Sequence, residues 1–120
     1  MIIKSGNINT MTENGAEGGK GILHLDKLHE VEPPAKNVRL FSIATLEPGA
    51  DVGYHQHIGE IEYYYILSGY AVYNDNGKEY YLAPGDLTYT PDGESHGIKN
   101  LSETENLVFI ALVVKESQFV

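Results

Sequence analysis

Short apolar runs recur along this 120-residue chain, and glycine, proline and asparagine separate them. Runs rich in β-branched and aromatic residues at 38–46, 63–67 and 107–114 predict strands. Residues 107–114 are apolar without interruption, so we expect a strand buried on both faces there rather than a helix. Short strands with turns between them and no convincing helix predict an all-β antiparallel sandwich or barrel.

A hairpin is predicted between residues 70–74 and 79–82. The dipeptide Asn76-Gly77 lies between these two runs, and it is the preferred centre of a two-residue hairpin turn. Gly85 suits the position of a type II turn that requires a positive φ.

Residues 1–37 are interpreted as an N-terminal extension of the same domain, and residues 38–120 as a β-barrel. The apolar group Met1–Ile3 is expected to add a strand at a sheet edge, and the glycine-rich run 14–21 to form a loop. A chain of 120 residues lies in the commonest size range of one domain, so we expect a single domain with one core.

The composition narrows both the chemistry and the partners. Because the chain has no cysteine, it can form neither a disulfide framework nor a thiolate metal site. Its formal charge of -9 argues against nucleic acid and anionic membranes as partners. No apolar run reaches the ~20 residues of a membrane span, and the first residues lack a long apolar core, so a cytoplasmic protein is expected.

Three histidines and a glutamate form the candidate metal site. His55 and His57 are two residues apart, so in a strand both side chains point to the same face. Glu62 has the opposite parity, but Gly59 permits a turn or bulge, after which a new strand could present Glu62 inward. His96 follows a proline and glycine turn signal. Such nitrogen and oxygen donors suit divalent Mn, Fe, Ni, Zn or Cu and leave an octahedral ion two open positions.

Plainer interpretations of these residues are also open. His55 and His57 could be core or surface histidines, and Glu62 could form an ion pair with Lys78 or Lys99. Because a carboxylate that points into a barrel needs a strong partner, we favour a metal cation as that partner.

Two longer patterns contain the candidate ligands and match without departure. They are G(X)5HXH(X)4E(X)6G, with Gly49, His55, His57, Glu62 and Gly69, and G(X)5PXG(X)2H(X)3N, with Gly85, Pro91, Gly93, His96 and Asn100. These are the two signature motifs of the cupins, and the chain resembles the small single-domain prokaryotic members that bind metal. The resemblance implies a double-stranded β-helix, or jelly-roll β-barrel, with the metal at its mouth.

Parity with the ligands predicts the substrate-binding residues. Tyr64 and Ile66 share the parity of Glu62, and Ile98 shares that of His96, so all three are expected to point toward the pocket. Tyr64 would lie close enough to donate a hydrogen bond to a ligand or a substrate oxygen.

Three other polar residues are assigned structural roles. His24 and His29 lie outside both motifs and are interpreted as surface or packing residues. Asn100 is expected to cap a turn through its side chain.

Two functions are compatible with such a site. The resemblance implies a metal-dependent enzyme acting on a small oxygenated molecule, as a dioxygenase, decarboxylase, isomerase or lyase. The alternative is a barrel that binds or senses a small metabolite without turnover. The lack of an appended DNA-binding segment favours the enzyme. The resemblance also implies a homodimer, in which the apolar ends Met1–Ile3 and 118–120 could pair.

Overall fold

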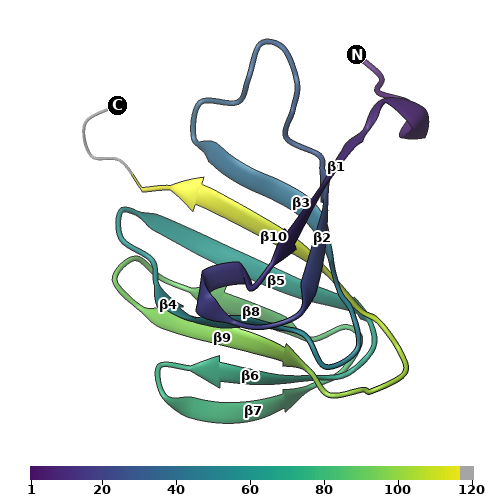
Figure 1. The fold of residues 1–120 in the computed structure, drawn as a ribbon. Coiled ribbons are helices and arrows are strands. Elements are labelled where there is room, and N and C mark those ends of the chain that lie inside the picture. The colour runs from purple at the N-terminus through teal and green to yellow at the C-terminus, as the bar shows by residue number, and fades with distance from the viewer. Residues whose placement is uncertain (117–120) are drawn as a thin grey trace.

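The computed structural model describes residues 1–116, which form two antiparallel sheets packed face to face (Figure 1). The larger sheet has the order β1-β2-β3-β10-β5-β8 and the smaller one β4-β9-β6-β7. The strands are β1 Asn9–Asn14, β2 Ile22–Lys27, β3 Val38–Leu46, β4 Asp51–Gln56, β5 Glu60–Ser68, β6 Ala71–Asp75, β7 Lys78–Leu82, β8 Leu87–Thr90, β9 Ser95–Asn100 and β10 Leu107–Lys115. Two short 3-10 helices, η1 Ser5–Asn7 and η2 Ala16–Gly18, complete the described elements. The all-β double-sheet prediction is confirmed.

The predicted hairpin is formed by β6 and β7. Asn76 and Gly77 both have a positive φ, 51° and 95°, as the tight hairpin turn demands. Gly85 also has a positive φ, and Asp86 N donates to Ala83 O across its turn. These turns were readable from sequence because their chemistry is local.

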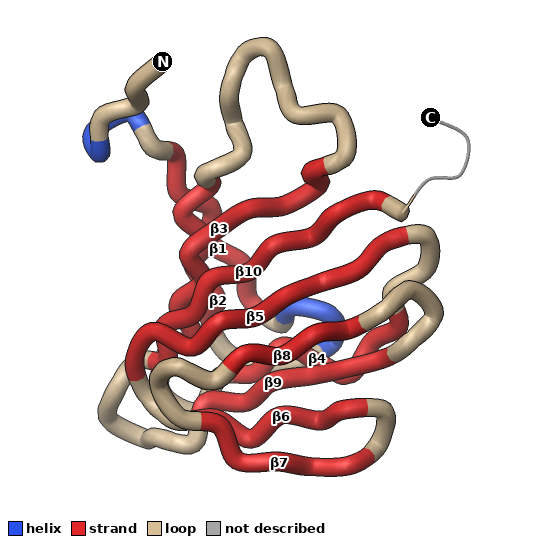
Figure 2. Tube along the Cα trace, turned by 180° about the vertical axis from the view of Figure 1, so that it is seen from behind, coloured by secondary structure: helices blue, strands red, loops and turns tan. Residues whose placement is uncertain are grey.

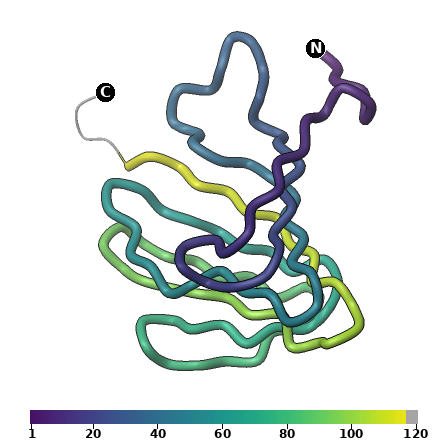
Figure 3. The backbone as a smooth tube through the Cα atoms, viewed as in Figure 1, coloured from purple at the N-terminus to yellow at the C-terminus, as the bar shows by residue number. Residues whose placement is uncertain are grey.

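The edge strand of the N-terminal extension is β1, not Met1–Ile3. β1 pairs with β2, which pairs in turn with β3, so the extension continues the larger sheet. The turn η1 directs the first residues away from the sheets, and Met1 and Ile2 are exposed (Figure 3). β1 is exposed along its whole length. Its mostly polar sequence therefore carries no hydrophobic alternation.

β10 lies in the middle of the larger sheet, but it is not buried on both faces. Its inward side chains are buried, whereas those of Val108, Ile110, Leu112 and Val114 are half-buried. No element of residues 1–116 covers the outer face of the neighbouring strands β3, β5 and β8 (Figure 2). The expected double burial is therefore wrong, and the outer residues form an apolar sheet surface instead.

The Asn100 side chain links the turn that follows β3 to the turn that precedes β10. Its amide nitrogen donates to the carbonyl oxygens of Leu46, Glu47 and Glu105, at 3.1, 3.2 and 2.8 Å. Its amide oxygen accepts a hydrogen bond from Ser102 N. The predicted turn cap is confirmed, and all four contacts come from one buried side chain.

Candidate metal centre

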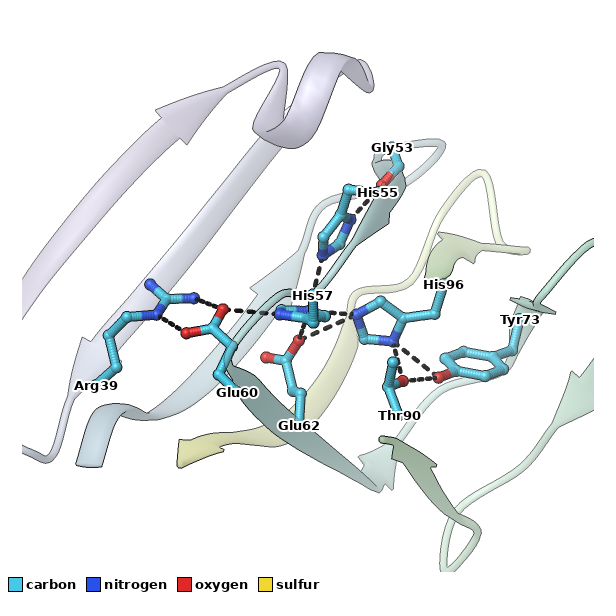
Figure 4. Close-up of polar contacts among 9 residues, drawn as sticks. All are labelled: Arg39, Gly53, His55, His57, Glu60, Glu62, Tyr73, Thr90 and His96. Carbon is cyan, nitrogen blue, oxygen red and sulfur yellow. Dashed lines mark hydrogen bonds and ion pairs between the residues drawn. The ribbon is translucent and has the colours of Figure 1, made fainter. Parts of the chain in front are cut away.

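The structure brings His55, His57, Glu62 and His96 into one cluster between the sheets (Figure 4). One potential ligand atom from each residue lies within 4.8 Å of the others. His57, Glu62 and His96 are buried, and His55 is half-buried. The two signature motifs therefore meet at one point, although 34 residues separate Glu62 from His96 in sequence.

Local backbone geometry explains this convergence. β4 ends at Gln56, and the chain turns through Gly59, which has a φ of 77°. β5 then begins before Glu62 and presents it inward, as the parity argument required. His55 pairs directly with His96 across β4 and β9.

The distances in the cluster suit an octahedral ion. His57 Nε2 lies 3.1 Å from His55 Nε2, 3.0 Å from His96 Nε2 and 2.9 Å from Glu62 Oε1. His96 Nε2 lies 3.0 Å from the same Glu62 oxygen. Ligands at ~2.1 Å from a metal and at right angles to each other are ~3.0 Å apart, whereas tetrahedral ligands would be ~3.4 Å apart.

Hydrogen bonds on the far side of each imidazole orient its free nitrogen toward the cluster. His55 Nδ1 donates to Gly53 O at 2.7 Å, and His57 Nδ1 lies 2.8 Å from Glu60 Oε1. His96 Nδ1 lies 2.8 Å from the Tyr73 hydroxyl and 2.9 Å from Thr90 Oγ1. With Nδ1 as the donor, each neutral imidazole directs a lone pair from Nε2 at the Glu62 carboxylate and its neighbours. Four lone pairs that face one another repel, and a cation bound between them would remove this repulsion.

Glu60, the hydrogen-bond partner of His57, is itself paired with Arg39. The Arg39 guanidinium donates from Nε and Nη2 to both Glu60 oxygens, with Nη2 2.9 Å from Oε1. Burial alone would raise the pKa of Glu60, but hydrogen bonds from Arg39 and His57 lower it overall. Glu60 therefore stays charged and stabilises His57. Sequence reasoning missed both Glu60 and Arg39, because nothing in their spacing shows that β3 and β5 bring them together.

Electrostatics favour a charged carboxylate at the centre. Burial acts to raise the pKa of Glu62, but hydrogen bonds with His57 and His96 lower it overall. The hydrogen bond to Glu62 raises the pKa of His57, and burial lowers that of His96. Lys78 and Lys99 are not the partners of Glu62, since its ion pairs go to the two histidines.

A pocket of about 210 Å³ opens onto the cluster. Its walls are mostly apolar and come from the larger sheet, from β4 and from η2. The polar lining residues are Glu13, Glu17, Arg39, His55, His57, Glu62 and Tyr64. This volume is below the roughly 300–1,000 Å³ of pockets for drug-sized ligands, so the pocket suits a small metabolite.

The predicted substrate-binding residues lie in two different settings. Tyr64 lines the pocket, and its ring stacks on His96 with centroids 4.8 Å apart. Ile66 and Ile98 point inward but are buried in the core and do not line the pocket. Contact of either isoleucine with a substrate stays a prediction.

His24 and His29 lie outside the cluster. His24 contacts Thr12 Oγ1 and Glu47 Oε2, and His29 Nδ1 lies 3.3 Å from Phe41 O. Both make strand-to-strand contacts within the larger sheet or its connections.

The cupin-domain family model matches residues 42–114, more than half of the chain, and includes all four cluster residues. The chain is a cupin. The resemblance found in the two motifs is thus confirmed over the barrel as a whole. A divalent metal site in this cupin fits the donor set, the distances and the second hydrogen bond of each histidine.

A curated protein and a solved structure, both from Thermotoga maritima, are similar to nearly the whole of this cupin. The oxalate-binding protein of that organism is 40% identical over 114 residues, which cover 95% of this chain and 93% of the relative. The crystal structure of a predicted oxalate decarboxylase is 38% identical, with a TM-score of 0.87, and covers 96% of this chain and 99% of that chain. A sugar phosphate isomerase from Silicibacter pomeroyi shares the fold, at 20% identity and a TM-score of 0.77 over 96% of this chain and 76% of that chain.

No helix among the described residues has the length and apolarity needed to cross a membrane.

Proposed function

We propose that this cupin is a metal-dependent enzyme that binds a small chelating carboxylate in the pocket beside His55, His57, Glu62 and His96. The convergence of three imidazole lone pairs and a charged carboxylate at one end of that pocket carries the proposal. A divalent Mn, Fe, Ni, Zn or Cu ion would supply Lewis acidity and open positions for the oxygen atoms of the ligand.

The surrounding residues would hold and orient the ligand. Apolar walls exclude water and strengthen each electrostatic contact inside the pocket. Burial raises the pKa of Tyr64 well above its usual value, so its hydroxyl stays protonated and can donate to a ligand oxygen. Arg39 also lines the pocket, and its charge is paired with that of Glu60.

The similarity to the oxalate-binding protein and to the predicted oxalate decarboxylase structure of Thermotoga maritima supports a small dicarboxylate such as oxalate as the ligand. Oxalate can chelate an ion through two adjacent oxygens, and its size suits the 210 Å³ pocket. Dioxygenation, isomerisation and lyase action on other small oxygenated molecules are alternatives that the same donor set could perform.

The proposal is tested with untagged protein loaded separately with each of the five metals. We expect oxalate to bind the loaded protein in calorimetry and not the metal-free protein, with product formation followed by mass spectrometry. The His55→Ala variant should bind neither metal nor oxalate. Metal-loaded protein that binds no oxalate, 2-hydroxy acid or 2-oxo acid would contradict the proposal.

A second function, binding without turnover, is favoured by the similarity to the oxalate-binding protein of Thermotoga maritima, which is 40% identical. Product formation distinguishes the two functions. Tight binding of oxalate with no product from any metal form, in air or under anaerobic conditions, would support the binding protein and remove the enzyme.

We also propose that the cupin forms a homodimer through the outer face of its larger sheet. Two lateral rows of apolar side chains cross β3, β10, β5 and β8 in register. They are Phe41, Leu112, Tyr63 and Tyr89 in one row, and Ile43, Ile110, Tyr65 and Leu87 in the other. Neither row contains a charged residue, so two copies of this chain, with its net charge of -9, could meet here without placing like charges in contact.

The exposed area is substantial. Phe41, Tyr63, Tyr65 and Tyr89 are 38, 38, 42 and 46% exposed. At ~150–250 Å² per aromatic side chain, these rings alone expose roughly 250–400 Å², a large part of the ~800 Å² per partner of a standard interface. Pairing through Met1–Ile3 stays a prediction, and residues 118–120 lie outside the described residues.

Sedimentation of the Tyr63→Glu/Tyr65→Glu variant tests the dimer. Wild type should sediment as a dimer and the variant as a monomer with unchanged circular dichroism. The control Tyr81→Glu alters an exposed tyrosine of β7, in the other sheet, and should stay dimeric. A monomeric wild type at micromolar concentration would overturn the proposal.

A further inference from the structure

The glycine-rich run predicted as a loop is a compact cap over the metal pocket. Gly15 N donates to Gly21 O at 3.0 Å and closes the segment at its base. Within it, η2 places Ala16 against the pocket, where this side chain is only 3% exposed. Figure 1 shows η2 beside β4, the strand that carries His55.

Close backbone contacts fix this cap on β4. Lys20 N donates to Asp51 Oδ1 and Asp51 N donates to Lys20 O, both at 2.9 Å. A Cβ atom at Gly53 would collide with Glu17 O, and one at Gly19 would collide with Asp51. Glycine at these positions allows a contact that no side chain would permit. Gly53 also supplies the carbonyl oxygen that orients His55, so the same residue contacts both the cap and a metal ligand.

Glu17 lies in the cap in an unfavourable backbone conformation. Its φ is 51°, in the left-handed region, between two glycines with positive φ. Glycine would adopt this conformation without strain, so local structure does not explain a glutamate here. Glu17 is exposed to solvent, and it lines the pocket together with Glu13 and the ligands His55, His57 and Glu62.

We propose that this cap selects the ligand of the metal pocket, with Ala16 limiting its size and Glu17 limiting its negative charge. The inference rests on the proposed function, because it takes a metal-chelating carboxylate as the ligand. Each added negative charge on a ligand is repelled by the charge of Glu17, which lines the same pocket. Glu17 therefore reduces the preference for a doubly charged acid that a positively charged metal would give on its own.

The Glu17→Gln variant tests the charge effect with two probes, oxalate as a dianion and glycolate as a monoanion. Because Coulomb energy is proportional to ligand charge, we expect affinity to rise about threefold for glycolate and about tenfold for oxalate. Glu103→Gln makes the same change at an exposed residue outside the pocket and should leave both affinities unchanged. Equal changes for the two probes, or no change, would overturn this part of the inference.

Two further variants separate selection from folding. Glu17→Gly relieves the left-handed strain, so it should keep or raise the melting temperature and shift the two affinities in the same way as Glu17→Gln. Ala16→Leu should weaken oxalate binding at least tenfold with metal content unchanged, and Ala16→Ser should bind as wild type does. Unchanged oxalate binding by Ala16→Leu would contradict the size limit.

Azide binding to the Co²⁺-loaded protein, read from its visible spectrum, keeps the test independent of the physiological ligand. If oxalate and every 2-hydroxy and 2-oxo acid fail to bind the metal-loaded wild type, the proposed function fails. The cap proposal still requires that azide binds wild type, binds about threefold more tightly to Glu17→Gln, and is excluded by Ala16→Leu. Identical azide binding in all three proteins, or none in wild type, would overturn it.

Discussion

The two ends of the barrel interior are built from the same strands but differ in chemistry. On β5, Ile66 pairs with Phe109 of β10 in an apolar core, and four residues earlier Glu62 joins a buried cluster of histidines. The apolar end needs only its own side chains, because burial of apolar surface is favourable. The polar end buries potential metal-ligand atoms, whose lone pairs repel one another unless a cation lies between them. One end therefore stabilises the fold, and the other provides the binding chemistry.

Truncation at the apolar end should have the largest effect on stability. Leu107 is fully buried and does not line the pocket. Leu107→Ala should lower the free energy of unfolding by about 2–5 kcal/mol in urea titration. The metal bound per folded chain should not change, and the exposed Leu101→Ala should have little effect. A loss below ~1 kcal/mol would show that the apolar end does not dominate stability.

Substitution at the polar end should show the opposite pattern. Glu62→Gln keeps the shape of the side chain but removes the charged donor, so metal affinity should fall more than about 100-fold. The free energy of unfolding of the metal-free protein should change less than in Leu107→Ala. Competition with a chromogenic chelator gives the affinity. Unaltered affinity in Glu62→Gln would exclude this carboxylate as a ligand.

Substitution of Glu60, which orients His57, should lower metal affinity less than substitution of Glu62 does. Glu60→Gln weakens the acceptor of His57 Nδ1 and the pair with Arg39, and we expect metal affinity to fall about 10- to 100-fold. The matched substitution Glu79→Gln, on the exposed strand β7, should have no effect. If both variants bind metal equally, orientation of His57 by Glu60 is unimportant.

Lowering the pH should reduce metal affinity gradually, and by less per pH unit than the Glu62→Gln substitution does. The raised pKa of His57 means that a proton competes with the metal already above pH ~6.5, and His96, whose pKa is lowered, is protonated only further down. Affinity should therefore be full at high pH and fall as pH drops, by about tenfold per unit for each proton displaced. Metal retention unchanged at pH 4.5 would contradict histidine ligation.

The sequence predicts those parts of this comparison that depend on local chemistry or on a fixed motif. Asn76-Gly77 specifies its hairpin, and the motif spacing identifies His55, His57, Glu62 and His96 as one group. Both signals depend on residue type and spacing alone.

The features that depend on how the strands and sheets pack together could not be predicted from the sequence. Arg39 and Glu60 are far apart in sequence and meet only because β3 and β5 flank β10. β1 is polar and exposed, so no periodic pattern marks it as a strand. β10 is apolar on both faces, and sequence cannot show that its outer face has no covering element among residues 1–116.

Elemental analysis of untagged wild-type protein and of the His55→Ala/His57→Ala variant decides whether the polar end of the barrel holds a metal ion. We expect close to one Mn, Fe, Ni, Zn or Cu ion per chain in the wild type and none in the folded variant. Absence of metal from the wild type, even after incubation with each ion, would contradict the assignment of the polar end as a metal centre.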